Sequence, residues 1–390
     1  MRKPRTDWAV TICVPLVAAL VVVPSTQPAR GEARAEASCG FLSQSTVPAQ
    51  RRTAIARGFN LPGWLDGANT RRPDPAMLET LHRRGFTHVR LPVTPERLMP
   101  EFSAEPDIAR DRLELDAAID RLMAIGFAVS LDLHPGSRLE RMHVAEPERA
   151  FGLLDALWRQ LSRRYAGRPA DRLFFEVLNE PAVSRSLWEQ QGPRLAQTIR
   201  NSAPQHTIVF GGTNFQRIDA LPPTPLLKLP NVIYAVHFYA PMVFTHQGLD
   251  WSDDPLRYLH GVPFPSSLSD PVIERLLREL RVTNRDQTAD RLDQELRQPW
   301  DLSRIAAEMR RAAAWGRQHG VPVVLNEFGV LAWKAPAVDR LRWLEAVRRS
   351  AEQACIGWTH WDYADAFGFV RRVGDREIAD EAVLRALLAE

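Results

Sequence analysis

Short apolar runs alternate along this chain with amphipathic stretches of helical period. Eight runs rich in Val, Ile, Leu and Phe predict β-strands over residues 54–61, 87–93, 127–134, 173–180, 207–213, 232–239, 322–328 and 357–363. Six stretches between them predict helices over residues 74–84, 110–125, 146–165, 185–202, 303–319 and 336–353. Strands that are apolar almost throughout are typical of a parallel sheet covered by helices. The pattern therefore predicts an α/β fold.

The number of repeating units points to one architecture within that class. Eight strand–helix units predict a (β/α)8 TIM barrel. An open doubly wound sheet is the alternative, and it is less favoured because no Gly-x-Gly-x-x-Gly turn follows the first strand. A long insertion, residues 240–300, follows strand 6, and its part 270–298 has a helical pattern. We expect it at the barrel face that carries the active site; a decorative surface insertion is the alternative.

The first 37 residues differ from the rest of the chain. Basic residues at positions 2, 3 and 5 precede an apolar run over 9–23, and Ala35-Glu36-Ala37 offers a cleavage site. This pattern predicts a signal peptide over 1–37 and a single domain over 38–390. An uncleaved anchor is the alternative, and cleavage after Ala33-Arg34-Ala35 also fits. We expect a secreted or periplasmic protein that has no membrane contact after cleavage.

Composition and charge narrow the possible partners. With 45% hydrophobic and 25% charged residues, the chain is typical of a folded soluble protein and unlike a disordered or multi-span one. The first 37 residues hold five basic and three acidic residues, which leaves 45 basic against 44 acidic residues in the remainder. This near balance gives no reason to expect a nucleic-acid partner. We expect a monomer.

The cysteines leave one question open. Cys39 and Cys355 are the two that follow the predicted signal peptide. They could pair in an exported protein, but a sequence gives no distance between them, so the pairing stays open. Neither a Cys-x-x-Cys nor a His-Glu-x-x-His motif is present, so a structural zinc site has no support. We expect no metal and no cofactor.

Polar residues gather at the ends of the predicted strands, where a barrel places its chemistry. Glu180 and Glu327, each preceded by Asn, end strands four and seven on roughly opposite sides of the mouth. Two facing carboxylates suit glycoside hydrolysis, in which one protonates the leaving oxygen and the other attacks the anomeric carbon. Arg90 and the hydroxyl of Tyr239 are available as hydrogen-bond donors to the attacking carboxylate.

Strand parity predicts a deeper layer beneath this pair. Side chains two residues apart share one face of a strand, which places Asp132 below His134 and Glu176 below Glu180. Carboxylates in such a position are partly buried and need a partner, for which Arg90 is the candidate.

Tryptophans supply surfaces on which sugars stack. We expect sugar platforms at the three that lie at or just past strand ends, namely Trp64, Trp333 and Trp361. The tryptophans inside predicted helices are expected in the core instead, and they are Trp158, Trp315 and Trp343. Trp188 and Trp251 stay undecided.

Taken in order, the strand-end motifs resemble those of glycoside hydrolase family 5, the cellulase family. The resemblance extends over about residues 57–369. It is carried by Gly58-Phe59-Asn60, Val89-Arg90-Leu91-Pro92, Leu133-His134, Leu178-Asn179-Glu180-Pro181, His237-Phe238-Tyr239, Asn326-Glu327-Phe328-Gly329 and Trp358-Thr359-His360-Trp361. It implies a retaining (β/α)8 hydrolase, endo-β-1,4-glucanase-like, that acts on a β-glucan or a related polysaccharide or oligosaccharide without a metal.

The same resemblance implies roles for individual residues. Glu180 would be the acid/base and Glu327 the nucleophile. The supporting residues would be Asn179 for the sugar 2-hydroxyl, Tyr239 and Arg90 for the nucleophile, His237 for the acid/base, His134 for sugar binding and Trp361 for the floor of the subsite beside the cleaved bond.

Other functions remain as alternatives. The family also contains β-1,3-glucanases and mannanases, so the fold and motifs define the mechanism better than the sugar. A carbohydrate-binding pseudoenzyme is disfavoured because both glutamates are present. A metal-dependent barrel hydrolase would use a different set of ligands, Asp132, His134, His237 and His360. Linkage specificity and internal against terminal cleavage stay open.

Overall fold

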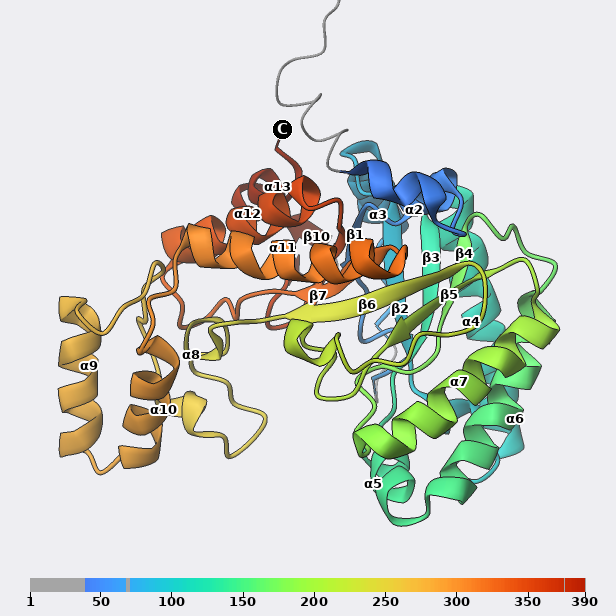
Figure 1. The fold of residues 1–390 in the computed structure, drawn as a ribbon, viewed down its shortest axis with the longest axis horizontal. Coiled ribbons are helices and arrows are strands. Elements are labelled where there is room, and N and C mark those ends of the chain that lie inside the picture. The colour runs from blue at the N-terminus through green and yellow to red at the C-terminus, as the bar shows by residue number, and fades with distance from the viewer. Residues whose placement is uncertain (1–38, 68–70, 375, 390) are drawn as a thin grey trace, which may run out of the picture.

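Eight parallel strands close into a barrel in this protein, whose computed structural model describes residues 39–67, 71–374 and 376–389 (Figure 1). The strands pair in sequence order from first to last, and the last pairs with the first, which confirms the predicted (β/α)8 fold. Their bounds are β1 (Arg57–Asn60), β2 (His88–Val93), β3 (Ala128–Leu133), β4 (Leu173–Glu176), β5 (Thr207–Gly211), β6 (Val232–Phe238), β7 (Val323–Phe328) and β8 (Gly357–His360).

Helices surround the barrel, and all six predicted ones are present. They are α3 (Pro75–Arg83), α4 (Glu105–Ile125), α6 (Pro147–Tyr165), α7 (Arg185–Ser202), α11 (Leu302–His319) and α12 (Ala337–Gln353). Shorter elements that the periodicity did not predict are α2 (Ala49–Ala54), α5 (Ser137–Ala145), α8 (Met242–Thr245), the hairpin of β9 (Val370–Val373) and β10 (Arg376–Ala379), and α13 (Glu381–Leu388). Four 3-10 turns complete the described chain: η1 (Gly40–Gln44), η2 (Pro95–Leu98), η3 (Ile218–Ala220) and η4 (Pro255–Tyr258).

Several strands are shorter than predicted, and this matters for the site. The fourth ends at Glu176 and the eighth at His360, so Glu180 and Trp361 lie in the loops that follow them. Beyond Glu176 the amides of Val177 and Asn179 still donate to the neighbouring strands, but the amide of Glu180 donates to the side chain of Gln216. Apolar content alone could not show this, because Val177 and Leu178 are buried like strand residues.

The lower part of the barrel interior is filled with apolar side chains. The strand residues of this cluster are Ala128, Phe174, Val209, Ile233, Ala235 and Val324. Val47 and Ile55, which flank α2, join the same cluster, so the N-terminal segment closes the barrel beneath the starts of the strands. Buried His88, at the start of β2, lies next to this cluster and bonds to Ser130 and Thr359. The buried charged residues of the strands lie higher, towards the carboxyl ends, where a TIM barrel places its active site.

The insertion after β6 forms a small helical arm. The stretch predicted as helical, 270–298, contains α9 (Pro271–Val282) and α10 (Asp286–Leu296), which lie side by side and project from the barrel (Figure 1). The chain reverses between them at Asn284, whose φ is +57°. The apolar faces of both helices are buried: Ile273, Leu276 and Leu280 on one, Ala289, Leu292 and Leu296 on the other.

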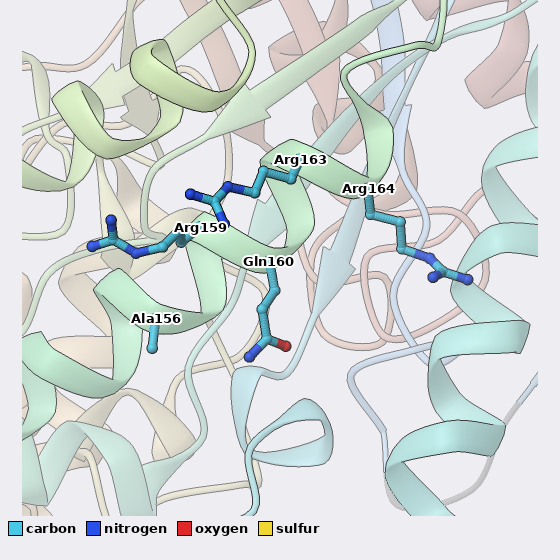
Figure 2. Close-up of a pocket in the computed structure, with 5 residues that line it drawn as sticks. All are labelled: Ala156, Arg159, Gln160, Arg163 and Arg164. Atoms are coloured by element: carbon cyan, nitrogen blue, oxygen red, sulfur yellow. The ribbon is translucent and has the colours of Figure 1, made fainter.

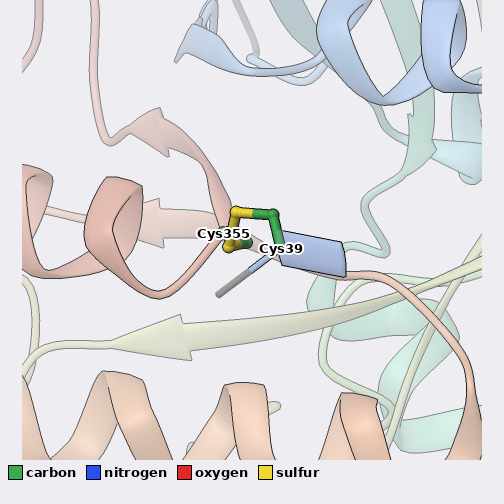
Figure 3. The surroundings of a disulfide bond; sticks show 2 residues. All are labelled: Cys39 and Cys355. Carbon is green, nitrogen blue, oxygen red and sulfur yellow. A yellow bond between two sulfur atoms is a disulfide. The ribbon is translucent and has the colours of Figure 1, made fainter. Parts of the chain in front are cut away.

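A disulfide answers the question that the sequence left open. Cys39 and Cys355 are bonded, with their Cα atoms 5.6 Å apart (Figure 3). Cys355 lies just before β8, and Cys39 begins the segment that closes the base of the barrel. The bond joins two cysteines that are 316 residues apart in the chain, and it therefore ties the N-terminal segment to the start of β8.

The predicted signal peptide, residues 1–37, lies outside the described residues. Among the residues that the structure describes, no helix is both long enough and apolar enough to cross a membrane.

Removing the disulfide should destabilise the fold. A cross-link that closes so long a loop restricts the unfolded chain, and such bonds contribute about 2–4 kcal/mol. We expect Cys39→Ser, Cys355→Ser and the double variant each to lower the free energy of unfolding in urea by the same amount. Equal stability of wild type and double variant would contradict this, and additive losses in the two single variants would show that the thiols act separately.

Candidate active site

Arg90 occupies the centre of the upper barrel and is fully buried. From β2, its Nε and Nη2 atoms donate to the two oxygens of Glu176 at 2.7 and 2.8 Å. Its Nη1 donates to Glu327 Oε1 at 2.6 Å, and its Nη2 lies 3.1 Å from Asp132 Oδ2. The predicted deeper layer of carboxylates with Arg90 as its partner is thus confirmed.

One guanidinium among three buried carboxylates leaves an excess of negative charge. Burial lowers the pKa of Arg90, but the charges of Asp132, Glu176 and Glu327 outweigh burial and raise it well above its usual value. Burial raises the pKa of Glu176 to about 7 against the attraction of Arg90. Arg90 therefore stays charged, and Glu176 is the carboxyl of this group that can take up a proton near neutral pH.

Glu327, at the end of β7, has each of its oxygens held by a donor. Arg90 donates to Oε1, and the hydroxyl of Tyr239 donates to Oε2 at 3.0 Å. Burial and the charge of Glu327 raise the pKa of Tyr239 well above its usual value, so the phenol keeps its proton. Both donors that the sequence suggested are therefore in place.

A β-bulge gives Glu327 this position. Along β6 and β7, Val236 pairs with Leu325 but His237 pairs with Glu327, so Asn326 is the extra residue. Bulges of this kind re-aim side chains next to active sites. Asn326 also donates from Nδ2 to Glu176 Oε1 at 2.7 Å. Asn326 precedes Glu327 in the Asn-Glu dipeptide, but the sequence pattern alone predicts no role for it.

Glu180 meets Glu327 across the mouth of the barrel. Its Oε1 lies 2.7 Å from His237 Nδ1, and one oxygen of Glu180, Nδ1 of His237 and one oxygen of Glu327 all lie within 4.8 Å of one another. Burial raises the pKa of Glu180, but the hydrogen bond and charge of His237 outweigh it and lower the pKa below its usual value. The side chain of Glu180 is 26% exposed, which leaves it open to a substrate in the mouth.

The same three residues are the one group in the described part of the chain whose atoms could surround a metal ion. The ligand set considered from the sequence does not assemble. His360 is buried with its ring edge-on to Phe328. His134 instead bonds to Asp132, with Nδ1 and Oδ2 3.0 Å apart. The metal-dependent alternative with Asp132, His134, His237 and His360 as ligands is therefore wrong for this structure.

One wall of the mouth is built by His134, Asn179 and Trp361. Nε2 of His134 lies 3.2 Å from Nδ2 of Asn179, whose Oδ1 accepts from Arg90. The ring of Trp361 stacks on that of His134 with centroids 5.7 Å apart and planes at 27°. An aromatic face and an amide beside Glu327 suit a sugar that is stacked and hydrogen-bonded there.

The other tryptophans divide into core and surface. The prediction for Trp64 is wrong: it is 1% exposed, and its Nε1 donates to Glu114, so no ring face is left for a sugar. Trp333 is 46% exposed in the loop after β7. The helical tryptophans expected in the core are buried, as is the undecided Trp188; this set is Trp158, Trp188, Trp315 and Trp343.

Trp251, also undecided from sequence, is 56% exposed at the edge of a group of rings. It contacts His246 and Phe367, with ring centroids 6.3 and 6.2 Å apart. His246 in turn packs edge-on against Tyr239 at 5.0 Å. The insertion therefore contacts Tyr239, which donates to Glu327, through His246. It also places the exposed ring of Trp251 against His246.

A surface depression elsewhere has no part in this site. Figure 2 shows its lining on α6, formed by Ala156, Arg159, Gln160, Arg163 and Arg164. These residues lie in the second half of a helix that leads back to the start of β4, so the depression faces the base of the barrel rather than its mouth.

A (β/α)8 barrel with two carboxylates facing each other at its mouth is the architecture of a glycoside hydrolase. Comparison with known proteins agrees: the sequence model of the family described as Cellulase (glycosyl hydrolase family 5) matches residues 48–366. The chain therefore belongs to glycosyl hydrolase family 5, whose resemblance the strand-end motifs had indicated.

Individual relatives are distant. Endoglucanase 3 of Fibrobacter succinogenes is 26% identical over 352 residues, which cover 83% of this chain and 52% of that protein. Endoglucanase C of Acetivibrio thermocellus is 25% identical over 331 residues, which cover 78% of this chain and 90% of that protein. A solved structure described as an endoglucanase is 25% identical, with a TM-score of 0.72, and the match covers 88% of this chain and all of that one. The chain thus spans about half of the first relative's length.

His134 should make the stability of the protein fall at alkaline pH. Burial lowers its pKa, but the hydrogen bond and charge of Asp132 outweigh burial and raise it to about 9. A histidine in the unfolded chain has a pKa of about 6.5, so between the two pKa values the folded protein holds a proton that the unfolded chain has released. The stabilisation is complete below the pKa of the unfolded chain and is lost as pH rises through the pKa of the folded protein. We expect the unfolding free energy to decrease between about pH 7.5 and 9.5, and to decrease less in His134→Gln.

His206→Gln is the matched control for this experiment. Burial lowers the pKa of His206 to about 4, so it is neutral over the whole interval and its replacement should leave the slope unchanged. A slope that is the same in wild type and His134→Gln would rule out the paired, protonated histidine.

Proposed function

We propose that this protein is a retaining endo-β-1,4-glucanase in which Glu327 is the nucleophile and Glu180 the acid/base. The observation that carries the proposal is the proximity of the two carboxyls, whose facing oxygens lie within 4.8 Å. Retaining glycosidases hold their carboxyl groups about 5–5.5 Å apart, whereas inverting ones leave about 6.5–9.5 Å for a water molecule. The close pair therefore favours direct attack by Glu327.

In the first step an oxygen of Glu327 bonds to the anomeric carbon while the bond from that carbon to the leaving oxygen breaks. Glu180 gives its proton to the leaving oxygen, which departs as a hydroxyl. Arg90 and Tyr239 donate to Glu327 and hold its carboxyl in position for the attack. In the second step water attacks the anomeric carbon and gives a proton to Glu180, and Glu327 leaves as a carboxylate.

Glu180 must carry a proton when the sugar arrives, although His237 lowers its pKa in the free protein. A sugar seated over the pair takes water away from the carboxyl, and loss of hydration raises a carboxyl pKa. The negative charge of Glu327 acts in the same direction. Substrate binding itself thus favours the acid form, as the first step requires.

The substrate class follows from relatives more than from geometry. Relatives named endoglucanases favour a β-1,4-glucan, and we expect a polysaccharide or oligosaccharide to bind along the mouth beside Trp361. A β-1,3-glucan or mannan is the alternative within the family. A carbohydrate-binding pseudoenzyme is disfavoured because both carboxyls and the donors to each are present.

We further propose that the protein is exported and acts as a monomer. The residues before Cys39 have the pattern of a cleaved signal peptide. The disulfide supports export, since such bonds persist in oxidising compartments outside the cytoplasm.

The test is product analysis on β-1,4-, β-1,3- and mixed-linkage glucans and on mannan, with the anomer formed first identified by proton NMR. We expect hydrolysis of β-1,4-glucan with retention, and a loss of about 10²–10⁴-fold in kcat for Glu327→Gln and Glu180→Gln. Glu279→Gln, at an exposed position on α9, is the control and should behave as wild type. Inversion, or a Glu327→Gln variant with substantial turnover, would refute the mechanism.

Trp251 should contribute to the binding of longer substrates. Its exposed ring lies beyond Tyr239 and His246, where a sugar distant from the cleaved bond can stack. Aromatic stacking contributes about 0.5–1.5 kcal/mol, which corresponds to about two- to tenfold in affinity. We expect Trp251→Ala to raise KM by this factor for long cello-oligosaccharides and to leave the shortest substrate unaffected.

Tyr258→Ala is the matched control because it removes another aromatic ring of the same insertion. The guanidinium of Arg285 already covers a face of that ring at 3.9 Å, and in the described part of the chain the ring makes no contact with those of His246 and Tyr239. A KM increase that is equal for all chain lengths, or equal in both variants, would show that Trp251 has no distal sugar to bind.

A further inference from the structure

The loop after β5 has an unusual main-chain conformation beside the catalytic pair. Three consecutive residues, Asn214, Phe215 and Gln216, have left-handed φ values of +58°, +55° and +49°. Glu180 is also left-handed, with a φ of +38°. Residues other than glycine seldom adopt this conformation, and such strain persists where the surrounding contacts impose it, often at functional sites.

Gln216 connects these two strained segments. Its side-chain Oε1 accepts the main-chain amide of Glu180 at 3.0 Å. Its main-chain carbonyl accepts the amide of His237 at 2.8 Å. His237 in turn bonds to the carboxyl of Glu180. Buried Gln216 is therefore hydrogen-bonded to the main-chain amides of both Glu180 and His237.

The neighbouring main chain makes room for this glutamine. A Cβ atom on Gly211, the last residue of β5, would lie 1.5 Å from Gln216 Nε2 and 2.4 Å from its Cδ. Only glycine at position 211 therefore leaves the amide where it reaches Glu180. Nε2 itself bonds to no described protein atom, so the contact of Oε1 with Glu180 is the one side-chain hydrogen bond that fixes the amide.

From these contacts we infer that Gln216 is a positioning residue for proton transfer: its side chain holds Glu180 in the left-handed conformation that aims the carboxyl at the leaving oxygen. The inference rests on the proposed function, since it takes Glu180 as the acid/base. Gln216 does not touch the substrate in this role. It acts through the main chain of Glu180, while its own main-chain contact with His237 is retained whichever side chain stands at 216.

The chemistry of the leaving group separates positioning from a merely structural role. A poor leaving group, such as the sugar hydroxyl of a cello-oligosaccharide, needs a proton from Glu180 as its bond breaks. A dinitrophenolate leaves as an anion and needs none. Misplacing Glu180 should therefore slow the first reaction and spare the bond-breaking step of the second, whereas general damage to the fold slows both.

The experiment measures kcat/KM for a cello-oligosaccharide and for the dinitrophenyl β-glycoside of a short one, in wild type and in Gln216→Leu. Because kcat/KM reports the steps up to the first irreversible one, it isolates bond breaking from the later attack of water. We expect a loss of about tenfold or more on the oligosaccharide and less than about twofold on the dinitrophenyl substrate. Gly211→Ala, which displaces the amide without changing residue 216, should give the same selective loss.

Gln191→Leu is the matched control. Gln191 is equally buried, but it lies on α7 and bonds to His143, so its replacement should affect both substrates alike. Equal losses on both substrates in Gln216→Leu, or no loss on either, would overturn the inference.

A crystal structure of Gln216→Leu gives a readout that does not depend on turnover. We expect Glu180 to leave its left-handed conformation and to lose its contact with His237; an unchanged Glu180 would overturn the inference. If the wild type hydrolyses no β-glycoside, the proposed function fails while this structural result still decides whether Gln216 positions Glu180.

Discussion

The guanidinium of Arg90 is the interaction on which the upper barrel depends. It is fully buried, and it is surrounded by Asp132, Glu176 and Glu327, which come from three different strands. Three carboxylates could not be buried together without this cation, since an unpaired charge in the interior carries a large desolvation cost. The nucleophile proposed here is thus one member of a charge network whose other members are out of reach of substrate.

That network also constrains the geometry around it. Asn326, the extra residue of the β7 bulge, bonds to Glu176, while its neighbour Glu327 turns towards the mouth beside Tyr239. On the other side His134 is held by its hydrogen bond to the buried carboxyl of Asp132. Each group near the substrate is therefore held by a buried partner, which reduces the reorganisation needed when a sugar binds.

The insertion adds a second level of organisation to the barrel. Its helices α9 and α10 bury their apolar faces in the same hydrophobic cluster as the barrel. The segment between α8 and α9 supplies the ring of Trp251 near the mouth. The barrel thereby carries an exposed aromatic ring near Tyr239, which donates to Glu327. Such additions change what a barrel binds without disturbing the residues that perform the reaction.

The sequence by itself determined the barrel and most of its chemistry. Eight apolar runs, each followed by polar residues, can be read from periodicity because a buried parallel strand has to be apolar on both faces. The same order of motifs pointed to Glu180 with its partner His237 and to Glu327 with its donors Arg90 and Tyr239. Parity placed Asp132 and Glu176 below them. These inferences depend on spacing along a single strand, which a sequence records directly.

Tertiary structure decided what depends on contacts between distant segments. Trp64 looked like a strand-end platform, but a neighbouring helix covers it and Glu114 takes its indole hydrogen. The pairing of Cys39 with Cys355, the bulge at Asn326 and the contact of Gln216 with Glu180 each join residues whose separation in space no local pattern encodes. The succession of apolar runs and their hydrophobic period can be read along the chain, whereas the contact partners of each side chain are set only when the barrel closes.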